Sequence, residues 1–248
     1  MTHLKALAGA AVLAAFVLCA IGAGSASATT THVCTAEHLG EPTTPKFEDS
    51  SCTKSNETKG TFHLTQLKPG VPTNVVQNSK SSQTFSATIG GVKFSFVCEV
   101  LTSKGSFTNV EGPPMKTVGT FSPAEFTKCK VEEPAGKGCV VPETISTKAL
   151  KAASQPMTEA EATKVRIEPE SGETFMAFTV SGCTITALNG EKVVKGFAQA
   201  VVPEGNESTL EFSGSSGSSL SVGGASITYT GKIGTFMEGT TEPMVWRA

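Results

Sequence analysis

The sequence predicts an all-β protein with an antiparallel β-sandwich-like core, stapled by disulfides and with little helix. Three observations support this fold class. Apolar and polar residues alternate on both sides of Gly90-Gly91, which is typical of a β-hairpin. Glycine and proline divide the rest of the chain into short segments. Six cysteines remain once a predicted leader peptide is removed, and an even count in an exported chain indicates disulfides.

The N-terminal residues 1–28 are expected to be a secretory signal peptide. Lys5 supplies the positive charge, residues 6–21 are almost entirely apolar, and Ala26-Ser27-Ala28 fits the A-x-A cleavage pattern. The apolar run is shorter than the roughly 20 residues that a spanning helix needs, so cleavage is favoured over a membrane anchor. We therefore expect a mature chain, 29–248, that is secreted and extracellular.

The mature chain has room for a single β-rich domain, and two small β domains are the alternative. We expect a polar, stapled N-terminal segment over residues 29–70 and the main β body over residues 71–248. Removing Lys5 with the leader changes the formal net charge from −2 to −3. Without a basic cluster the chain is not expected to bind nucleic acid. No segment of the mature chain is long and apolar enough to span a bilayer.

The clearest element is the predicted hairpin over residues 84–98. Phe85, Ala87 and Ile89 share one face of its first strand. The inward face of the second strand carries Phe94, Phe96 and Cys98, so the Cys98 sulfur should point into a core. We expect this second strand to end near Lys104-Gly105.

Further strands are expected wherever alternation resumes between turn residues. They cover residues 60–67, 106–110, 116–121, 126–131, 174–187, 193–202 and 225–236. Ser122-Pro123 is expected to begin one helical turn, with Ser122 as its cap. Residues 213–224 have the composition of a flexible linker.

Residues 144–165 are ambiguous. Ala149 and Leu150 favour a helix, and Thr158-x-x-Glu161 resembles a capping box. Pro156 would interrupt a long helix, and the alternation at Ile145, Thr147 and Ala149 favours strands. We interpret the segment as two strands joined near Pro156, with a short helix as the alternative.

The six cysteines allow 15 pairings, so the connectivity is a hypothesis. Cys34–Cys52 are the nearest pair in the polar N-terminal segment, and closing that loop would contribute about 3 kcal/mol. Cys129–Cys139 are expected to pair across a turn-rich hairpin. Cys98–Cys183 then pair by elimination, since both are expected to lie in long apolar strands.

Candidate catalytic and metal sites are weak. A nucleophilic triad would need one of His32, His38 and His63 with Asp49 or a glutamate to orient it, and no G-x-S-x-G elbow is present. The same histidines with Cys34 and Cys52 have metal-ligand chemistry, but an exported cysteine pair is more often a disulfide. No catalytic residue, metal ligand or cofactor is therefore assigned.

Glutamates provide the remaining route to catalysis, since a glycosidase uses a pair of carboxylates. The available ones are Glu168, Glu170, Glu173, Glu191, Glu204 and Glu207. Glutamates beside Pro and Gly are usually solvated turns, and sugar sites normally use stacking aromatic residues. Phenylalanine dominates the aromatic content, which indicates core packing rather than a recognition face. Asn56 and Asn206 match the N-glycosylation pattern but are expected to be bare in a bacterial host.

Short Gly, Cys and Pro landmarks between residues 86 and 203 suggest a family. They are Gly119-Thr120-Phe121-Ser122-Pro123, Cys129-x-Val131, Gly138-Cys139, residues 146–150, Ile167-Glu168-Pro169 and Gly182-Cys183. In this respect the chain resembles a group of uncharacterised secreted proteins of high-GC Gram-positive (actinobacterial) bacteria. The resemblance implies export and a β-rich, disulfide-containing body. It implies no activity, so it carries no functional residue over.

These observations favour a non-enzymatic extracellular or cell-envelope protein that acts in adhesion, envelope structure or partner binding. Its expected partner is a cell-envelope or extracellular protein. One alternative is a secreted hydrolase with a Glu-based site. Another is a small secreted inhibitor or ligand carrier that uses a loop or a cavity.

Overall fold

The computed structural model describes residues 30–36, 44–155, 163–204, 208–214 and 217–247. Within these ranges the chain forms β-strands and one 3-10 turn, η1 (Thr186–Leu188), and the predicted all-β class is confirmed. The strands are β1 (Thr30–Thr35), β2 (His63–Gln66), β3 (Thr73–Ser79), β4 (Gln83–Ile89), β5 (Val92–Val110), β6 (Lys116–Phe121), β7 (Glu125–Glu133), β8 (Thr144–Ser146), β9 (Leu150–Ser154), β10 (Lys164–Pro169), β11 (Thr174–Val180), β12 (Gly190–Lys195), β13 (Ala198–Val201), β14 (Thr209–Ser213), β15 (Ser221–Val222), β16 (Ala225–Met237) and β17 (Met244–Arg247).

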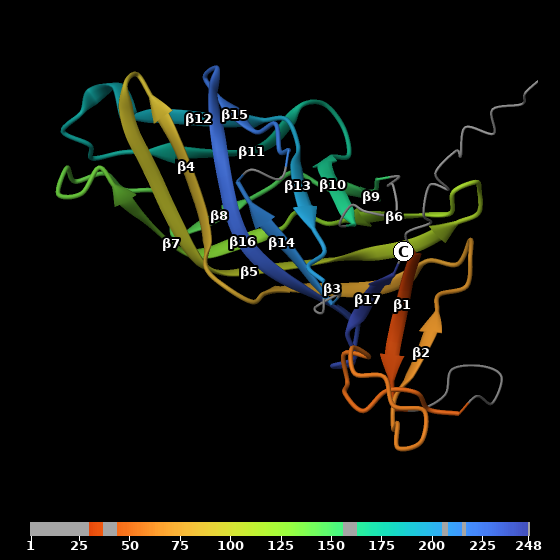
Figure 1. The fold of residues 1–248 in the computed structure, drawn as a ribbon. Helices are drawn as coiled ribbons and strands as arrows, with labels where there is room; N and C mark the ends of the chain where they lie inside the picture. Colours follow the sequence, from red (N-terminus) through yellow and green to blue (C-terminus); the bar gives the residue numbers. More distant parts are fainter. Residues whose placement is uncertain (1–29, 37–43, 156–162, 205–207, 215–216, 248) are drawn as a thin grey trace, which may run out of the picture.

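The main body is a closed eight-stranded antiparallel barrel, so the predicted sandwich is wrong. Its strands follow the order β3-β5-β6-β9-β10-β13-β14-β16, and β16 pairs back onto β3 (Figure 1). A sandwich keeps two separate sheets with edges, whereas closure pairs every edge. Strand β3 closes the barrel because it pairs with β5 on one side and with β16 on the other.

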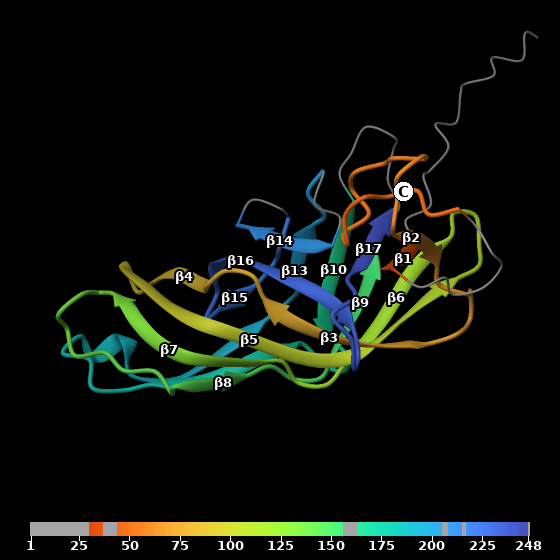
Figure 2. The same cartoon turned by 90° about the horizontal axis from the view of Figure 1, so that it is seen from below.

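Two long strands extend the wall beyond this barrel. One part of β5 pairs with β3 and β6, and the part nearer its start pairs with β4 and β7. β16 likewise pairs with β3 and β14 and then with β4 and β15. Figure 2 shows β5 sweeping through most of the molecule. The expected end of this strand near Lys104-Gly105 is therefore wrong: the chain stays extended and Gly105 lies opposite Phe121.

The predicted hairpin is confirmed. β4 and β5 pair from Gln83↔Cys98 to Ile89↔Val92, and Gly90 and Gly91 both have positive φ, as a type I′ turn requires. The rings of Phe85 and Phe96 stack with centroids 5.0 Å apart, and Tyr229, the partner of Phe85 on β16, stacks on Phe85 with centroids 4.5 Å apart. These rings belong to one large cluster of buried side chains. The phenylalanines thus fill the core, as their abundance indicates.

A separate three-stranded sheet, β17-β1-β2, lies against one end of the barrel (Figure 1). Its side chains Val33, Met244 and Trp246 pack into the main core, and Asn109 of β5, whose side chain is fully buried, adds hydrogen bonds to it. The Asn109 Oδ1 accepts hydrogen bonds from the Thr31 N–H (3.0 Å), the Thr31 hydroxyl (2.9 Å) and the Thr117 hydroxyl (2.8 Å). Its Nδ2 donates to the carbonyls of Thr31 (2.9 Å) and Leu67 (3.0 Å).

One of the three predicted disulfides is confirmed and two are wrong. Cys34–Cys52 forms as expected, but Cys98 bonds to Cys129 and Cys139 bonds to Cys183. Cys98 and Cys129 lie directly opposite each other in β5 and β7, with Cα atoms 4.0 Å apart. The two wrong pairings were based on a turn-rich hairpin and on elimination, and neither argument could show this register.

The strand predicted over residues 174–187 is shorter in the structure, and Cys183 lies in a loop. β11 ends at Val180, so Cys183 follows the strand rather than lying inside it. A Cβ atom on Gly138 would lie 2.9 Å from the Gly182 carbonyl oxygen, and one on Gly182 would lie 2.7 Å from that of Gly138. Both glycines have a φ near +70°. They let the two loops approach closely enough for the Cys139–Cys183 bond.

Other elements differ in detail. The expected helical turn at Ser122 is wrong: the chain has no helix there, and the Ser122 N–H donates to the Lys104 carbonyl (2.8 Å). In residues 144–165 the strand interpretation is confirmed by β8, β9 and the start of β10, while the capping box lies outside the described residues. Residues 193–202 form two strands, β12 and β13, and the expected linker at 213–224 contains β15. The predicted leader, 1–28, also lies outside the described residues.

Candidate functional site

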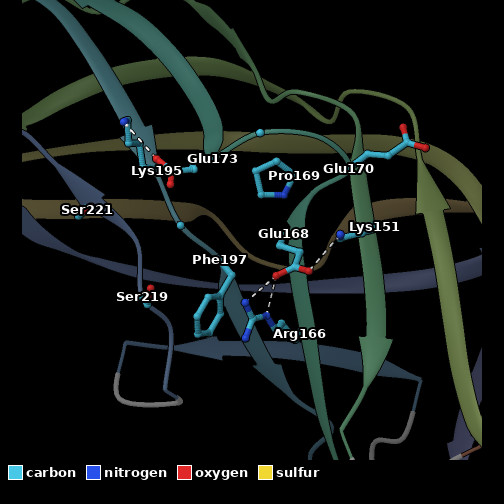
Figure 3. Close-up of a pocket in the computed structure, with 12 residues that line it drawn as sticks. Lys151, Arg166, Glu168, Pro169, Glu170, Glu173, Lys195, Phe197, Ser219 and Ser221 are labelled. Atoms are coloured by element: carbon cyan, nitrogen blue, oxygen red, sulfur yellow. Dashed lines mark hydrogen bonds and ion pairs between the residues drawn. The ribbon is translucent and has the colours of Figure 1, made fainter.

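A surface hollow with a volume of about 490 Å³ lies beside β9 and β10 (Figure 3). We call it the polar pocket. Its lining is mostly charged and hydroxylated side chains, with one aromatic ring. The lining residues are Lys151, Arg166, Glu168, Pro169, Glu170, Gly172, Glu173, Lys195, Gly196, Phe197, Ser219 and Ser221.

Strand register brings the central charges of the pocket together. Lys151 of β9 is the cross-strand partner of Glu168 of β10. Arg166 precedes Glu168 by two residues and therefore points to the same, outward face, whereas Ile167 between them is buried in the core. The pocket residues on β9 and β10 are thus the outward-facing residues of strands whose alternate residues fill the core.

A close backbone contact forms the opposite wall. Gly196 separates β12 from β13 with φ +101°, and a Cβ atom on it would lie 2.0 Å from the Ser219 carbonyl oxygen. The Ser219 N–H donates to the Phe197 carbonyl (2.9 Å), and the Gly196 N–H donates to the Glu173 carbonyl (3.1 Å). These contacts fix the Phe197 backbone beside the strands.

Ion pairs connect the side chains across the pocket. Arg166 binds one oxygen of Glu168 through both Nε (2.7 Å) and Nη2 (2.6 Å), and Lys151 lies 3.4 Å from the other oxygen. The guanidinium also lies over the Phe197 ring, 3.8 Å from its centroid, which is a cation–π contact. Lys195 and Glu173 form a second pair at 3.3 Å. All three cations of the pocket are therefore paired with carboxylates, as Figure 3 shows.

The electrostatics keep Glu168 ionised. Partial burial alone would raise the pKa of this carboxyl, but the hydrogen bonds and charges of Arg166 and Lys151 outweigh it and hold the pKa below the ordinary value. A general acid at neutral pH needs the opposite shift. Figure 3 also shows the carboxylates of Glu168, Glu170 and Glu173 pointing in different directions rather than toward one point. The arrangement suits hydrogen bonding to a ligand better than proton transfer.

A second hollow adjoins the polar pocket. This shallow hollow has a volume of about 480 Å³ and shares Glu170 with the pocket. A transverse row of strand partners runs across both: Asn74↔Ser106, Ser106↔Thr120, Thr120↔Lys151 and Lys151↔Glu168. The first three residues of this polar row line the shallow hollow and the last two line the pocket. The two hollows and the row together form what we call the polar groove.

The residues considered for a triad or a metal site lie elsewhere. Asp49 closes a loop, where its carboxylate accepts hydrogen bonds from Ser51, Thr53 and Lys54. His32 lies in β1 and His63 in β2, while His38 lies outside the described residues. Burial, with the nearby Arg247 charge, lowers the pKa of His32 despite a backbone hydrogen bond. In the described part of the chain, no three His, Cys, Asp or Glu side chains gather closely enough to hold a metal ion.

Of the six candidate glutamates, Glu168, Glu170 and Glu173 line the polar pocket. Glu191 and Glu204 line no described hollow, and Glu207 and Asn206 lie outside the described residues. Asn56 belongs to a turn in which its Oδ1 accepts hydrogen bonds from Thr58 and Lys59.

The barrel interior offers little space. The cavity between its walls has a volume of about 30 Å³ and is lined mainly by core side chains such as Leu101, Phe126 and Phe212. Small-molecule sites usually need about 300–1,000 Å³, so this space corresponds to about one water molecule. This cavity between the barrel walls is therefore too small to hold a small-molecule ligand.

Sequence reasoning missed Lys151, Arg166, Lys195 and Phe197. A weak signal existed, because Arg166 and Glu168 alternate around Ile167 and so share a face. The partner strand that brings Lys151 beside them is not visible in the sequence. The register between β9 and β10 brings these charged side chains together.

Comparison of the chain with protein families, curated proteins and solved structures finds no match. Among the described residues, no helix has the length and apolar character needed to cross a membrane. The three disulfides indicate an oxidising, non-cytoplasmic location. The evidence on function therefore comes from the polar groove itself.

Proposed function

We propose that this chain is a secreted, non-enzymatic binding protein of the extracellular space or cell envelope, and that the polar groove is its binding surface. The observation that carries the proposal is the state of Glu168. This central carboxylate is fixed in its charged form by Arg166 and Lys151, and a fixed, charged side chain provides recognition without proton transfer.

The two alternatives have less support. A Glu-based hydrolase would need two carboxylates that converge on a substrate and one with a raised pKa, and Glu168 has a lowered one. A ligand carrier would need an enclosed cavity of useful size, and the described interior provides about 30 Å³. Secretion is supported by the predicted leader and by the disulfides, which form in oxidising compartments.

Turnover assays test the proposal. The oxidised chain is incubated with ester, peptide and glycoside substrates, beside Glu168→Gln and Glu170→Gln. The control is Glu211→Gln, because Glu211 forms a similar ion pair with Lys232 (3.1 Å) outside the groove. We expect no turnover above the buffer rate for any variant. Turnover that Glu168→Gln or Glu170→Gln abolishes and Glu211→Gln preserves would make the protein a hydrolase.

A further inference from the structure

The charge balance of the polar groove limits the ligand. The pocket contains three cations and three carboxylates, and each cation already has a carboxylate partner. The shallow hollow adds the paired residues Lys104 and Glu238, 3.0 Å apart. A charged ligand that bound to Glu168, Glu173, Lys104 or Lys195 would have to compete with the pair already present there. An uncharged ligand can bind while every pair stays intact.

The groove also offers many hydrogen-bonding groups in fixed positions. Arg166 has five N–H groups and gives two of them to Glu168, so three have no partner among the described residues. Its fork is held by the bidentate contact and by the Phe197 ring. The Ser106 and Thr120 hydroxyls lie 3.5 Å apart farther along the row. A hydroxyl both donates and accepts, so a ligand rich in hydroxyls can use acceptors and donors alike.

The shape of the site favours an extended chain. The polar row crosses β3, β5, β6, β9 and β10, and neighbouring strands lie about 4.8 Å apart, so the row spans about 19 Å. One side chain faces out at each strand step, at a spacing comparable with the repeat of a pyranose in an extended glycan. Two adjoining hollows along this row accommodate several units of such a chain.

A protein partner fits the groove less well. Protein interfaces contain an apolar, often aromatic core. The exposed large hydrophobic side chains of the described surface are Val71 and Val140, and neither lines the groove. The polar surface of the groove therefore lacks the apolar anchor that a protein partner would bind. Since only Phe197 provides an accessible ring, stacking is limited and affinity should be modest.

We infer that the polar groove binds an uncharged polysaccharide chain, whose hydroxyls hydrogen-bond to the polar row from Asn74 to Glu168. The inference rests on the proposed function and names its ligand class. Arg166, Glu168 and Lys151 contact one end of the bound chain and Ser106 and Thr120 the other. The ion pairs remain intact during binding.

Isothermal titration calorimetry tests the inference with the full oxidised chain. The neutral probes are maltohexaose, cellohexaose, mannohexaose and chitohexaose, each beside its disaccharide, and the anionic probe is hexagalacturonate. We expect at least one neutral hexamer to bind with a Kd of about 1 mM or tighter, and at least about 10-fold more tightly than its disaccharide. Hexagalacturonate should bind more weakly than that hexamer.

Three variants test the mechanism. Glu168→Gln leaves Arg166 and Lys151 without their carboxylate, so it should weaken the neutral hexamer about 10-fold and strengthen hexagalacturonate. Thr120→Arg places a bulky, exposed side chain at the middle of the row and should remove the advantage of the hexamer over the disaccharide. Glu211→Gln is the matched control and should change neither affinity. Circular dichroism confirms that each variant is folded.

The outcomes separate this inference from the proposed function. If no neutral hexamer binds, if hexagalacturonate binds the unmodified chain most tightly, or if Glu211→Gln acts like Glu168→Gln, the polysaccharide inference is wrong and the non-enzymatic proposal stands. If a neutral hexamer binds and is cleaved, the ligand class is right and the non-enzymatic proposal is wrong.

Discussion

Replacing Asn109 tests how the terminal sheet is held to the barrel. In Asn109→Ala the fully buried amide disappears, and with it all five hydrogen bonds that it makes to β1, to Thr117 and to Leu67. The Thr31 N–H and the Leu67 carbonyl lose the partners described above. These are backbone groups, so no rotamer change can find new partners for them.

The magnitude follows from those two groups. Each buried backbone group left unpaired costs about 1–3 kcal/mol, so we expect Asn109→Ala to lower the free energy of unfolding by about 4 kcal/mol. The loss should be local before it is global, because Asn109 bonds to β1 of the terminal sheet while the barrel closes through β3 and β16. The sheet should therefore open at a lower denaturant concentration than the barrel.

Hydrogen exchange and urea denaturation measure both effects. In Asn109→Ala the amides of β1, β2 and β17 should exchange much faster, while those of β5 and β16 keep their protection. Thr108→Ala is the matched control, since Thr108 is the neighbour on β5 that faces outward, and its effect should stay within about 0.5 kcal/mol. A loss below about 1 kcal/mol, or equal loss of protection in the sheet and the barrel, would refute the reasoning.

Two further predictions concern packing and pH. Gly119→Ala would place a Cβ 2.7 Å from the Phe107 ring and 2.9 Å from a backbone oxygen. This crowding should lower the free energy of unfolding, measured with heat or urea, by about 1–3 kcal/mol, and an unchanged unfolding midpoint would contradict it. Partial burial tends to raise the pKa of Asp49, but hydrogen bonds from Lys54, Thr53 and Ser51 outweigh it and hold the pKa below the ordinary value of 3.8. The ionised carboxylate therefore stabilises the folded loop above pH 3.8, and this stabilisation is lost as the pH falls through the lowered pKa. Hydrogen exchange of the loop should show this acid sensitivity, and Asp49→Asn should remove it; equal sensitivity in both chains would assign it to other groups.

Local features of the fold could be predicted from the sequence. The hairpin at Gly90-Gly91 depends on alternation and on two residues with positive φ, and both are local properties. The Cys34–Cys52 pair lies within one short segment and needs no knowledge of the sheet. In these cases short-range chemistry determines the result.

Barrel closure and the other disulfides could not be predicted, because they depend on register between distant strands. Nothing in β3 itself shows that it pairs with β5 and with β16 together. Cys98 was expected to bond to Cys183 by elimination, as both were expected to lie in long apolar strands, whereas the actual partner, Cys129, is set by the pairing of β5 with β7. A one-residue shift between those strands would have turned the two sulfurs to opposite faces.

The same limit applies to the candidate site. Glu168 is one of the candidate carboxylates of the sequence analysis, but its role depends on Lys151 from the neighbouring strand β9. It also depends on Phe197, far away in the sequence, whose ring lies against the Arg166 guanidinium. The ion pairs also make Glu168 a poor general acid, because they lower its pKa and keep the carboxylate ionised, which suits ligand recognition instead. Sequence patterns place such residues on a face, and the fold decides which of them meet.

The pairing of β1 with β17 has a consequence for how the protein folds. Thr30 of β1 lies opposite Arg247 of β17, so strands from the two extremes of the described chain form one ladder. Such a contact cannot form until residue 247 has been synthesised and, for an exported chain, delivered across the membrane. Closing so long a loop is entropically costly and favours late formation. The terminal sheet should therefore be the last part to assemble, after the barrel has already closed.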